Sequence, residues 1–460
     1  MTIQRYELAL LAAIMAFATL ILGRQIGVAS AEFDEQVYLA SADTLTRGFD
    51  LGRDVFTSQP PLFLTMLQTA DNAFGGSATL MRLLLVLLTI AGSLGSWALV
   101  RARAGAVPAL VTALLVALAP GVVEAAAVVS ADVPCVVFGT LALLAASSAR
   151  RHPAWALAAG VLISAAILTK LLAVPFALAI AVGAFVHRAP CRAYVWFGCG
   201  TALAFAAVLL VYADVLGPLW HGAVALHLQA RGAQVDLPTP SILVAAILII
   251  SAYVGLLAVL AAGVLEVRRA ELAGWLRERA DLIALFAGGF ALCAVQRPLL
   301  NHHLVIVAWP LALLAGSALP ARLASRRTLA LACAGGLLIA PWAIHGRDTL
   351  DHGERGSLER VAEIVAMSTP GHGVVVSDLP AVPVLADRTS APGTVDPSYV
   401  RVQTGELSLA DVTAAARGAD AVVVGRAFRG LPGLQIALGR RFTHSVTLDR
   451  VTVWSAPRSS

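Results

Sequence analysis

Charged residues are scarce in this sequence. Asp, Glu, Lys and Arg make up 13% of its 460 residues, whereas a soluble domain has about 25%. Hydrophobic residues make up 58%, and the mean hydropathy is +0.81. This composition excludes an ordinary soluble globular protein and favours a chain that crosses a lipid bilayer several times. Apolar runs of about 17 to 25 residues, the length that spans a bilayer about 30 Å thick, recur through positions 1–345.

Cysteine is also scarce, and its placement excludes two kinds of site. The five cysteines lie in or beside apolar runs, none follows residue 345, and no C-x-x-C pair occurs. The sequence therefore predicts neither a disulfide framework nor a cysteine metal site. The net charge of +5 comes from arginines dispersed among short loops, so we expect no nucleic-acid partner.

Lysine occurs once, at Lys170, among 33 Lys and Arg residues. In a chain whose other basic residues are arginines, this lysine is retained either because its chemistry is required or by chance. Its ammonium could reach the membrane interface harmlessly, or it could hold a lipid phosphate as a point charge. Arg82 and Arg297 allow the same two interpretations. His302 and His303 could contact a metal or a phosphate, or could be purely structural.

The apolar runs predict a polytopic α-helical membrane domain over residues 1–345, with about eleven transmembrane helices. The first run is too long for the apolar core of a cleavable signal, so we expect it to remain as the first helix. The predicted spans are 8–28, 79–100, 107–123, 133–149, 154–169, 172–187, 193–213, 241–265, 282–296, 303–319 and 328–345.

Arginine gathers at one set of span ends. The positive-inside rule puts those ends and the N-terminus in the cytoplasm, and an odd number of spans puts the C-terminal part outside. The abundance of alanine and arginine is typical of a GC-rich bacterial genome, which predicts a bacterial plasma membrane. The arginines at these ends are Arg5, Arg101, Arg103, Arg150, Arg151, Arg188, Arg192, Arg268, Arg269, Arg277, Arg279, Arg322, Arg326 and Arg327.

The first outer loop, residues 29–78, is too long for a simple connector. Its pattern predicts a helix from Asp34 to Arg47 that ends at Gly48, since glycine commonly terminates helices. Pro60 and Pro61 then predict the start of a second helix, because proline suits a first helical turn. We therefore expect this loop to be a structured cap.

Three carboxylates lie in this loop just after the first span. Ionisable groups beside a membrane cost free energy, which indicates a function for Asp34 and Glu35, whereas Glu32 is expected to be solvated. A fixed carboxylate can act as a general base on a hydroxyl. Together with Asp132, on the same predicted side, the carboxylates could instead hold a divalent cation. Asp132 could also simply cap the helix whose first turn contains Pro134.

Residues 346–460 predict a small extracytoplasmic α/β domain with a partly parallel sheet. No glycine-rich phosphate loop is present, because Gly371-His372-Gly373 precedes a strand rather than following one. The predicted elements are strands at Val374–Val376 and Ala421–Val424, helices at Ser357–Met367 and Leu409–Ala416, and a hairpin of Phe442–Leu448 with Val451–Trp454.

A set of short motifs lies in order along about residues 35 to 316. They are Asp34-Glu35, Tyr38, Gly48, Pro60-Pro61-Leu62, Arg82, Ser130-Ala131-Asp132, Leu168-Thr169-Lys170, and His303 ahead of Trp309-Pro310-Leu311-Ala312-Leu313-Leu314-Ala315-Gly316. This set resembles the GT-C glycosyltransferases that use polyprenyl-phosphate sugars. The resemblance is to the bacterial relatives of protein O-mannosyltransferases and lipid A aminoarabinose transferases, which are like glycosyltransferase families 39 and 83.

The resemblance implies a role for each matched residue. Asp34, supported by Glu35, would take the proton from an acceptor hydroxyl, which would attack the anomeric carbon of the lipid-linked sugar and invert its configuration. Asp132 would orient the acceptor or a metal. Lys170 would bind the leaving phosphate, with help from basic residues that are candidates for the same contact: Arg82, His302, His303 and Arg297.

The implied partners are a polyprenyl-phosphate sugar donor, membrane lipid, and a glycan, lipid or protein acceptor. Two departures matter. Gln59 precedes the proline pair where relatives often have a basic residue, and no sugar-binding repeat domain is inserted between spans. A protein acceptor is therefore less supported, and acidic residues are too few for a bound divalent metal to be assumed.

Two other functions compete with the glycosyltransferase. A transporter or flippase of lipid-linked sugars would be expected to have charges in the middle of its spans and repeated halves. Here the charges gather at one face and no convincing repeat occurs, which favours the enzyme. An inactive relative that serves as an assembly partner is the third possibility.

Overall fold

A computed structural model describes residues 5–26, 32–232, 241–296, 299, 301–320, 335 and 352–456. The chain forms two compact units, and each is described by itself. Unit 1 comprises Met1–Gly27, Arg82–Val211 and Pro238–Asp348, and unit 2 comprises Val28–Met81, Tyr212–Leu237 and Thr349–Ser460.

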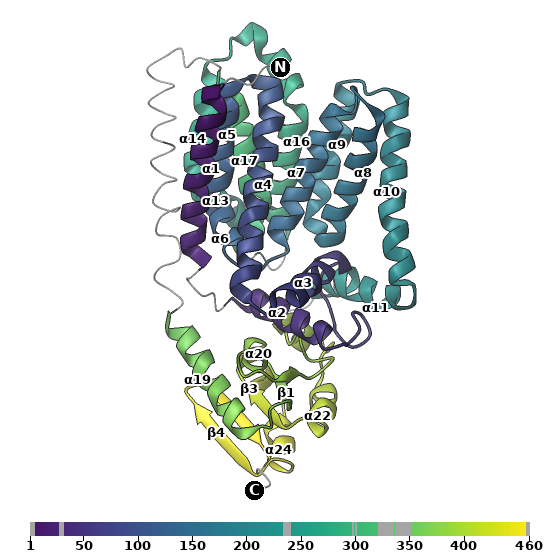
Figure 1. Ribbon diagram of the computed structural model, residues 1–460, viewed down its shortest axis with the longest axis vertical. Coiled ribbons are helices and arrows are strands. Elements are labelled where there is room, and N and C mark those ends of the chain that lie inside the picture. Colours follow the sequence, from purple (N-terminus) through teal and green to yellow (C-terminus); the bar gives the residue numbers. More distant parts are fainter. Residues whose placement is uncertain are drawn as a thin grey trace. The chain divides into compact units, whose positions relative to one another are not determined.

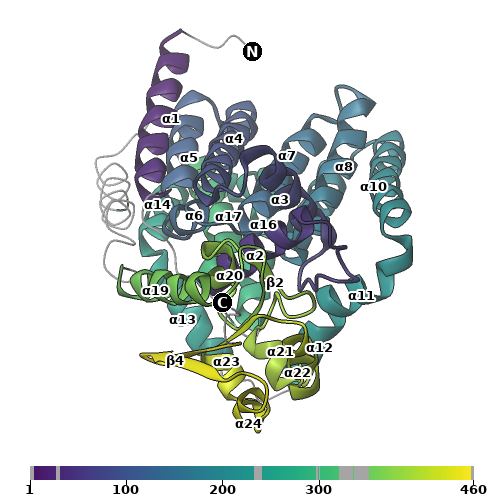
Figure 2. The ribbon, with the colours of Figure 1, turned by 60° about the horizontal axis from the view of Figure 1, so that its bottom comes forward.

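Unit 1 is a bundle of helices, and in both ribbon views α7, α8 and α10 run side by side (Figures 1 and 2). Its helices are α1 (Arg5–Ile26), α4 (Ala78–Ala104), α5 (Ala106–Leu118), α6 (Pro120–Ala126), α7 (Asp132–Ser148), α8 (Pro153–Thr169), α9 (Val174–Val186), α10 (Cys191–Val211), α13 (Ile242–Ala252), α14 (Val254–Leu265), α15 (Leu272–Glu278), α16 (Ala280–Val295) and α17 (Val305–Ala318). Every residue of α17 is buried, so this helix forms the centre of the core.

Among the described residues, three helices are long and apolar enough to cross a membrane: α1, α4 and α10. Two bent pairs, α5 with α6 at 57° and α13 with α14 at 74°, could each form one broken span. The apolar runs expected as spans at 107–123 and 241–265 therefore each form two helices with a bend between them. The first bend lies at Ala119, because a residue before proline disfavours helical geometry and Pro120 follows. The span expected at 328–345 lies outside the described residues, apart from residue 335, so the count of eleven stays a prediction.

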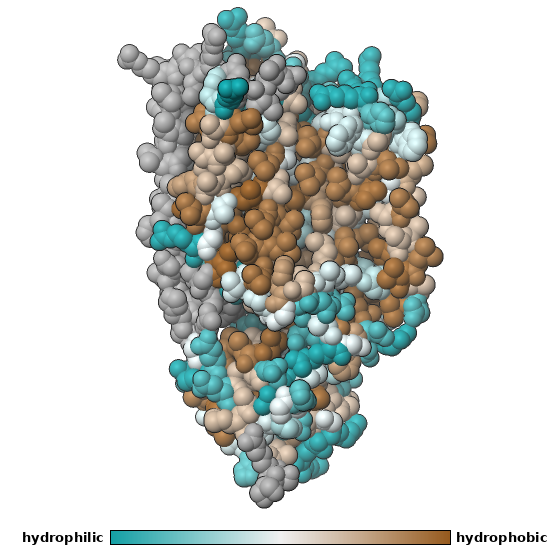
Figure 3. Space-filling model, viewed as in Figure 1, coloured by the Kyte–Doolittle hydropathy of each residue, from teal (hydrophilic) through white to brown (hydrophobic). Residues whose placement is uncertain are grey.

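The outer surface of the helix bundle exposes large apolar side chains. Along α10, large apolar side chains such as Leu203 and Leu210 are 61% and 83% exposed. Figure 3 shows hydrophobic residues over the face of the helices and hydrophilic residues over the arginine-bearing ends of α8, α9 and α10. A helix that is apolar on its exposed side is expected to contact lipid.

Helices α8 and α10 pack backbone to backbone through two glycines. A Cβ atom on Gly160 would lie 2.2 Å from the carbonyl oxygen of Phe197, and one on Gly200 would lie 2.2 Å from that of Leu157. Any larger residue would push the helices apart, because such distances are far below van der Waals contact. Small residues commonly allow this approach in membrane helices.

Buried ion pairs stabilise the arginine-bearing end of the bundle. Arg101 donates to both carboxylate oxygens of Glu7 at 2.6 and 3.1 Å, which ties α4 to α1. Arg103 donates to both oxygens of Asp281 at 2.9 and 2.7 Å, which ties α4 to α16. Both carboxylates are almost completely buried, so these pairs are part of the core.

Unit 2 combines the first outer loop, the segment after α10 and the C-terminal part. Its helices are α2 (Phe33–Thr46), α3 (Pro61–Phe74), α11 (Leu216–Trp220), a π-helical turn (His221–Ala225), α12 (Leu226–Gly232), α19 (His352–Ser368), α20 (Ala381–Leu385), α21 (Tyr399–Gln403), α22 (Leu409–Arg417), α23 (Arg426–Arg429) and α24 (Leu434–Gly439). Helix α2 begins and ends one residue before the predicted 34–47, and the predicted start of α3 at the proline pair is confirmed. Gly48 follows α2 with a φ of +97°, a conformation that glycine adopts readily, and Pro61 begins α3.

The C-terminal part of unit 2 is built on a mixed five-stranded sheet with the order β2-β1-β3-β5-β4. Strands β2, β1 and β3 are parallel, and β5 is antiparallel to β3 and β4. The predicted strands, hairpin and two helices are confirmed, and so is the partly parallel sheet. The strands are β1 (Val374–Ser377), β2 (Thr389–Ser390), β3 (Ala421–Val424), β4 (His444–Leu448) and β5 (Val451–Ser455).

Hydrogen bonds join the first outer loop, the segment after α10 and the C-terminal part within unit 2. The amide of Gly393 donates to the carbonyl of Asp54 at 2.7 Å, and a ring nitrogen of His227 lies 2.9 Å from the carbonyl oxygen of Ser58. The described part of the predicted first outer loop, residues 32–78, therefore contains helices α2 and α3 and, up to Met81, groups with the C-terminal part in one compact unit.

Candidate functional site

The residues predicted to be functional fall into both units. Unit 1 contains Asp132, Lys170, Arg82, His302 and His303, and unit 2 contains the acidic pair of the first outer loop. Arg297 lies outside the described residues.

In unit 1, the lysine and Asp132 meet directly. The Lys170 ammonium donates to Oδ1 and Oδ2 of Asp132 at 2.8 and 2.9 Å. Side-chain exposure is 5% for Lys170 and 2% for Asp132. The pair therefore lies in a region that excludes water, where an ion pair interacts far more strongly than at the surface.

Local structure brings these two residues together. Helix α7 begins at Asp132, while α8 ends at Thr169 and the chain turns sharply at Lys170, whose backbone is extended (φ −157°, ψ 133°). The Cys135 thiol lies 3.7 Å from the carbonyl oxygen of Lys170, which holds the turn against the first turn of α7. The short gap between the predicted spans 154–169 and 172–187 is thus a sharp turn.

The alternative that Asp132 merely caps a helix is wrong. The N-cap of α7 is Ala131, no side chain caps it, and the Asp132 carboxylate instead binds the lysine. Lys170 as a whole is 4% exposed, and its ammonium binds the Asp132 carboxylate, so the choice between the two interpretations of Lys170 stays a prediction.

The other basic candidates of unit 1 are buried near helix ends. Arg82 is 7% exposed and donates to the carbonyl of Ile26 at 3.1 Å, at the C-terminus of α1. His302 and His303 lie in the 3-10 turn before α17, each 8% exposed, with their rings in edge contact at 4.5 Å. The Cys293 thiol lies 3.6 Å from the His303 carbonyl oxygen. Contact of Arg82, His302 and His303 with the donor phosphate stays a prediction.

In unit 2, Asp34 lines a small cavity of about 40 Å³, which has room for water. Asp34 and Tyr38 lie four residues apart on α2, so their side chains share one face of the helix. The other lining residues come from the same helix, from the segment before α3 and from the C-terminal part: Phe33, Val37, Ser58, Asp396 and Ser398. Glu35 is 2% exposed and does not line this cavity.

Asp396 is a candidate that the sequence did not reveal. It is 3% exposed, and its carboxylate accepts from the Ser398 amide at 3.1 Å. Burial raises the pKa of Asp396, and the nearby Asp34 carboxylate adds to this, whereas Arg401 and the Ser398 donors oppose it. Its sequence context, an aspartate before Pro397, indicates only a turn.

Arg401 anchors this part of the cavity wall. Its guanidinium donates to the Asp396 carbonyl at 2.6 Å and stacks 3.9 Å above the ring of Phe56. Burial lowers the pKa of Arg401, while Asp396 and Glu406 raise it. The contact fixes the C-terminal part against the first outer loop inside unit 2, and so fixes the position of Asp396 opposite Asp34.

A divalent-cation site is one prediction for the carboxylates Asp34, Glu35 and Asp132. Among the described residues, no three His, Cys, Asp or Glu side chains lie close enough together to hold a metal ion. We therefore assign no step of the chemistry to a metal.

Comparisons with known proteins agree with this architecture. A sequence model of the dolichyl-phosphate-mannose-protein mannosyltransferase family matches residues 58–213, a segment that contains both Asp132 and Lys170. No curated protein sequence matches the chain significantly.

Solved structures of similar fold extend the comparison over nearly the whole chain. The crystal structure of ArnT from Cupriavidus metallidurans bound to undecaprenyl phosphate has 17% identity and a TM-score of 0.68, over 97% of this chain and 98% of that chain. The oligosaccharyltransferase AglB from Archaeoglobus fulgidus, in complex with an inhibitory peptide and a dolichol-phosphate, has 13% identity and a TM-score of 0.56, over 95% and 72%.

The arabinofuranosyltransferase AftD from Mycobacteria has 14% identity and a TM-score of 0.51, over 100% of this chain and 40% of that chain. The predicted fold class is therefore confirmed: an α-helical membrane protein with a small C-terminal sheet. This chain has the GT-C fold, and the family match together with that fold supports a membrane-embedded glycosyltransferase.

Proposed function

We propose that this protein transfers a sugar from a polyprenyl phosphate to an acceptor hydroxyl on the extracytoplasmic face of a bacterial plasma membrane. The single observation that carries the proposal is the buried Asp132–Lys170 pair. The family match spans both residues, and two proteins of similar fold have been solved with a polyprenyl phosphate bound. The acceptor can be a glycan, a lipid or a protein.

In the proposed reaction, Asp34 is the general base. Its carboxylate takes the proton of the acceptor hydroxyl while that oxygen attacks the anomeric carbon of the donor sugar. The bond between the anomeric carbon and the phosphate oxygen breaks, the phosphate keeps the electron pair, and the configuration at carbon inverts. Asp34 fits this role because it is half-buried and lines a cavity with room for a small polar group.

Lys170 would stabilise the phosphate that leaves. An ammonium has three N–H donors, and the two oxygens of Asp132 occupy two of them. The third can donate to a phosphate oxygen, and a cation fixed in a region without water is effective against developing negative charge. We therefore assign to Asp132 the role of holding Lys170, in place of orienting the acceptor or a metal.

The test is sugar transfer by the full chain in proteoliposomes that contain a polyprenyl-phosphate sugar. Asp34→Asn removes the base and should lower the turnover rate by about 10²- to 10⁴-fold. Asp43→Asn is the matched control, because Asp43 is on the same helix and forms an exposed ion pair with Arg47. Full transfer by Asp34→Asn would refute the assignment. Movement of lipid-linked sugar across vesicles without transfer would favour the flippase instead.

A further inference from the structure

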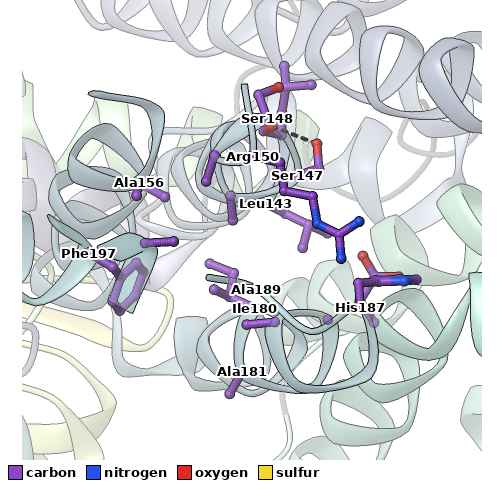
Figure 4. A pocket seen from close by; sticks show the side chains of 18 of the residues that line it. Leu143, Ser147, Ser148, Arg150, Ala156, Ile180, Ala181, His187, Ala189 and Phe197 are labelled. Atoms are coloured by element: carbon purple, nitrogen blue, oxygen red, sulfur yellow. Dashed lines mark hydrogen bonds between the residues drawn. The ribbon is translucent and has the colours of Figure 1, made fainter. Parts of the chain in front are cut away.

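A second cavity lies inside unit 1, among α7, α8, α9, α10 and α16, and has a volume of about 710 Å³. This is within the range of ligand pockets, about 300 to 1,000 Å³. Leu143, Ala156, Ile180, Ala189 and Phe197 surround the open space in Figure 4. The walls are mostly alanine and larger aliphatic or aromatic groups, so the interior suits a hydrocarbon chain and offers few hydrogen-bonding groups to a soluble metabolite.

Basic residues mark one end of this cavity. Arg150 and Arg151 follow α7 and line the cavity, and His187 lines it at the end of α9. Both arginines are exposed, and neither forms an ion pair with any residue in the described part of the chain. Their charge is therefore available to an anion at the mouth of the cavity.

The acidic residues of the lining are already paired. Asp281 accepts both hydrogen bonds from Arg103, and Glu278 lies 3.4 Å from the Arg279 guanidinium. They do not neutralise the two arginines at the mouth. The cavity thus combines apolar walls with a net positive opening.

This cavity is remote from the proposed phosphate contact. It lies where α8 begins at Pro153, whereas Lys170 follows the other end of the same helix. The 17 residues of α8 correspond to about 25 Å along the helix axis. A ligand headgroup here would be near the bundle end that the arginine distribution predicts to be cytoplasmic.

We infer that this cavity binds an anionic phospholipid, with an acyl chain between the helices and the phosphodiester beside Arg150 and Arg151. Basic pockets between transmembrane helices on the cytoplasmic side suit such headgroups, because that leaflet carries anionic lipid. The site is separate from the proposed sugar transfer, and its test does not depend on that activity.

The first experiment measures retained phosphatidylglycerol by native mass spectrometry after extraction from nanodiscs of phosphatidylcholine and phosphatidylglycerol. The double variant Arg150→Glu, Arg151→Glu should lose the retained lipid, with each arginine contributing about fivefold in affinity. Arg192→Glu is the matched control, since Arg192 is exposed at the same end of the bundle but does not line the cavity. This control should retain phosphatidylglycerol as the wild type does.

The second experiment blocks the cavity without changing its charge. Ala181 lines the cavity on α9, whereas its neighbour Val182 does not. Ala181→Trp should abolish lipid retention, and Val182→Trp should preserve it. Retention unchanged in both the double glutamate variant and Ala181→Trp would overturn the inference, as would a wild type that retains polyprenyl phosphate there and no phospholipid. If the glutamate variant does not fold, the tryptophan pair decides.

Discussion

Removing the charge of Lys170 should separate its structural role from its role in transfer. In Lys170→Met, the Asp132 carboxylate stays buried but loses the ammonium that donates to both of its oxygens. Breaking a buried pair in this way destabilises a protein by about 3 to 5 kcal/mol. The side-chain exposures of 5% and 2% show that the pair is buried, so this range applies to it.

The double variant Lys170→Met, Asp132→Leu should behave differently. Replacing both members of a buried pair by apolar residues is often neutral for stability. We therefore expect the unfolding midpoint in detergent to fall by several degrees in Lys170→Met and to recover in the double variant. Sugar transfer should be lost in both, by about 10²- to 10³-fold for a missing electrostatic group.

The pair of Arg103 and Asp281 is the matched control, because it is also buried and also joins one cation to both carboxylate oxygens. Asp281→Asn should lower the unfolding midpoint, yet the protein that remains folded should transfer sugar at the normal rate. Recovery of transfer in the double variant of Lys170 and Asp132 would contradict the reasoning, since the pair would then serve only the fold.

Two further predictions concern the fold. Gly200→Ala should lower the unfolding midpoint because its Cβ would meet the Leu157 carbonyl, whereas Gly198→Ala on the same helix meets nothing within 4 Å and should be neutral or slightly stabilising. Burial raises the pKa of Asp378 from its ordinary 3.8 to about 6, against hydrogen bonds from backbone amides that include Phe428. Because the pKa of Asp378 is higher in the folded than in the unfolded state, the stability that its protonated form contributes is lost as the pH rises through 6. Lowering the pH from 7 to 5 should therefore raise the free energy of unfolding by about 1 kcal/mol. Calorimetry should find this increase missing in Asp378→Asn.

The parts of the fold that depend on local chemistry could be predicted from the sequence. Gly48 and Pro61 set the limits of α2 and α3, and the valine runs at 374–376 and 421–424 form the central strands. Each of these signals involves residues that are close in the chain. Pro120 is a local signal as well, for the bend between α5 and α6, and it lies inside the apolar run 107–123 that predicts one span.

The candidate site depends on contacts that no local pattern encodes. Asp132 and Lys170 are 38 positions apart, and the sequence indicates only that both lie on one side of the bundle. Their pairing requires the sharp turn that brings the end of α8 beside the start of α7. Asp396 faces Asp34 because a distant part of the chain folds against the first outer loop through Arg401 and Phe56. Neither the position of Asp396 in the sequence nor its neighbouring residues indicate that it lies beside Asp34.

Under the proposed function, the single lysine has a physical explanation. At the arginine-bearing end of the bundle, the rigid guanidinium fork of Arg103 matches both oxygens of Asp281, which suits a permanent lock between two helices. At the other end, one nitrogen of Lys170 reaches both oxygens of Asp132 and keeps a third donor, on a stem of four carbons that can turn. An arginine at this position would direct the paired N–H donors of its guanidinium at the carboxylate. An ammonium is therefore the better group where a cation must be held in place and still donate to a phosphate that arrives and departs.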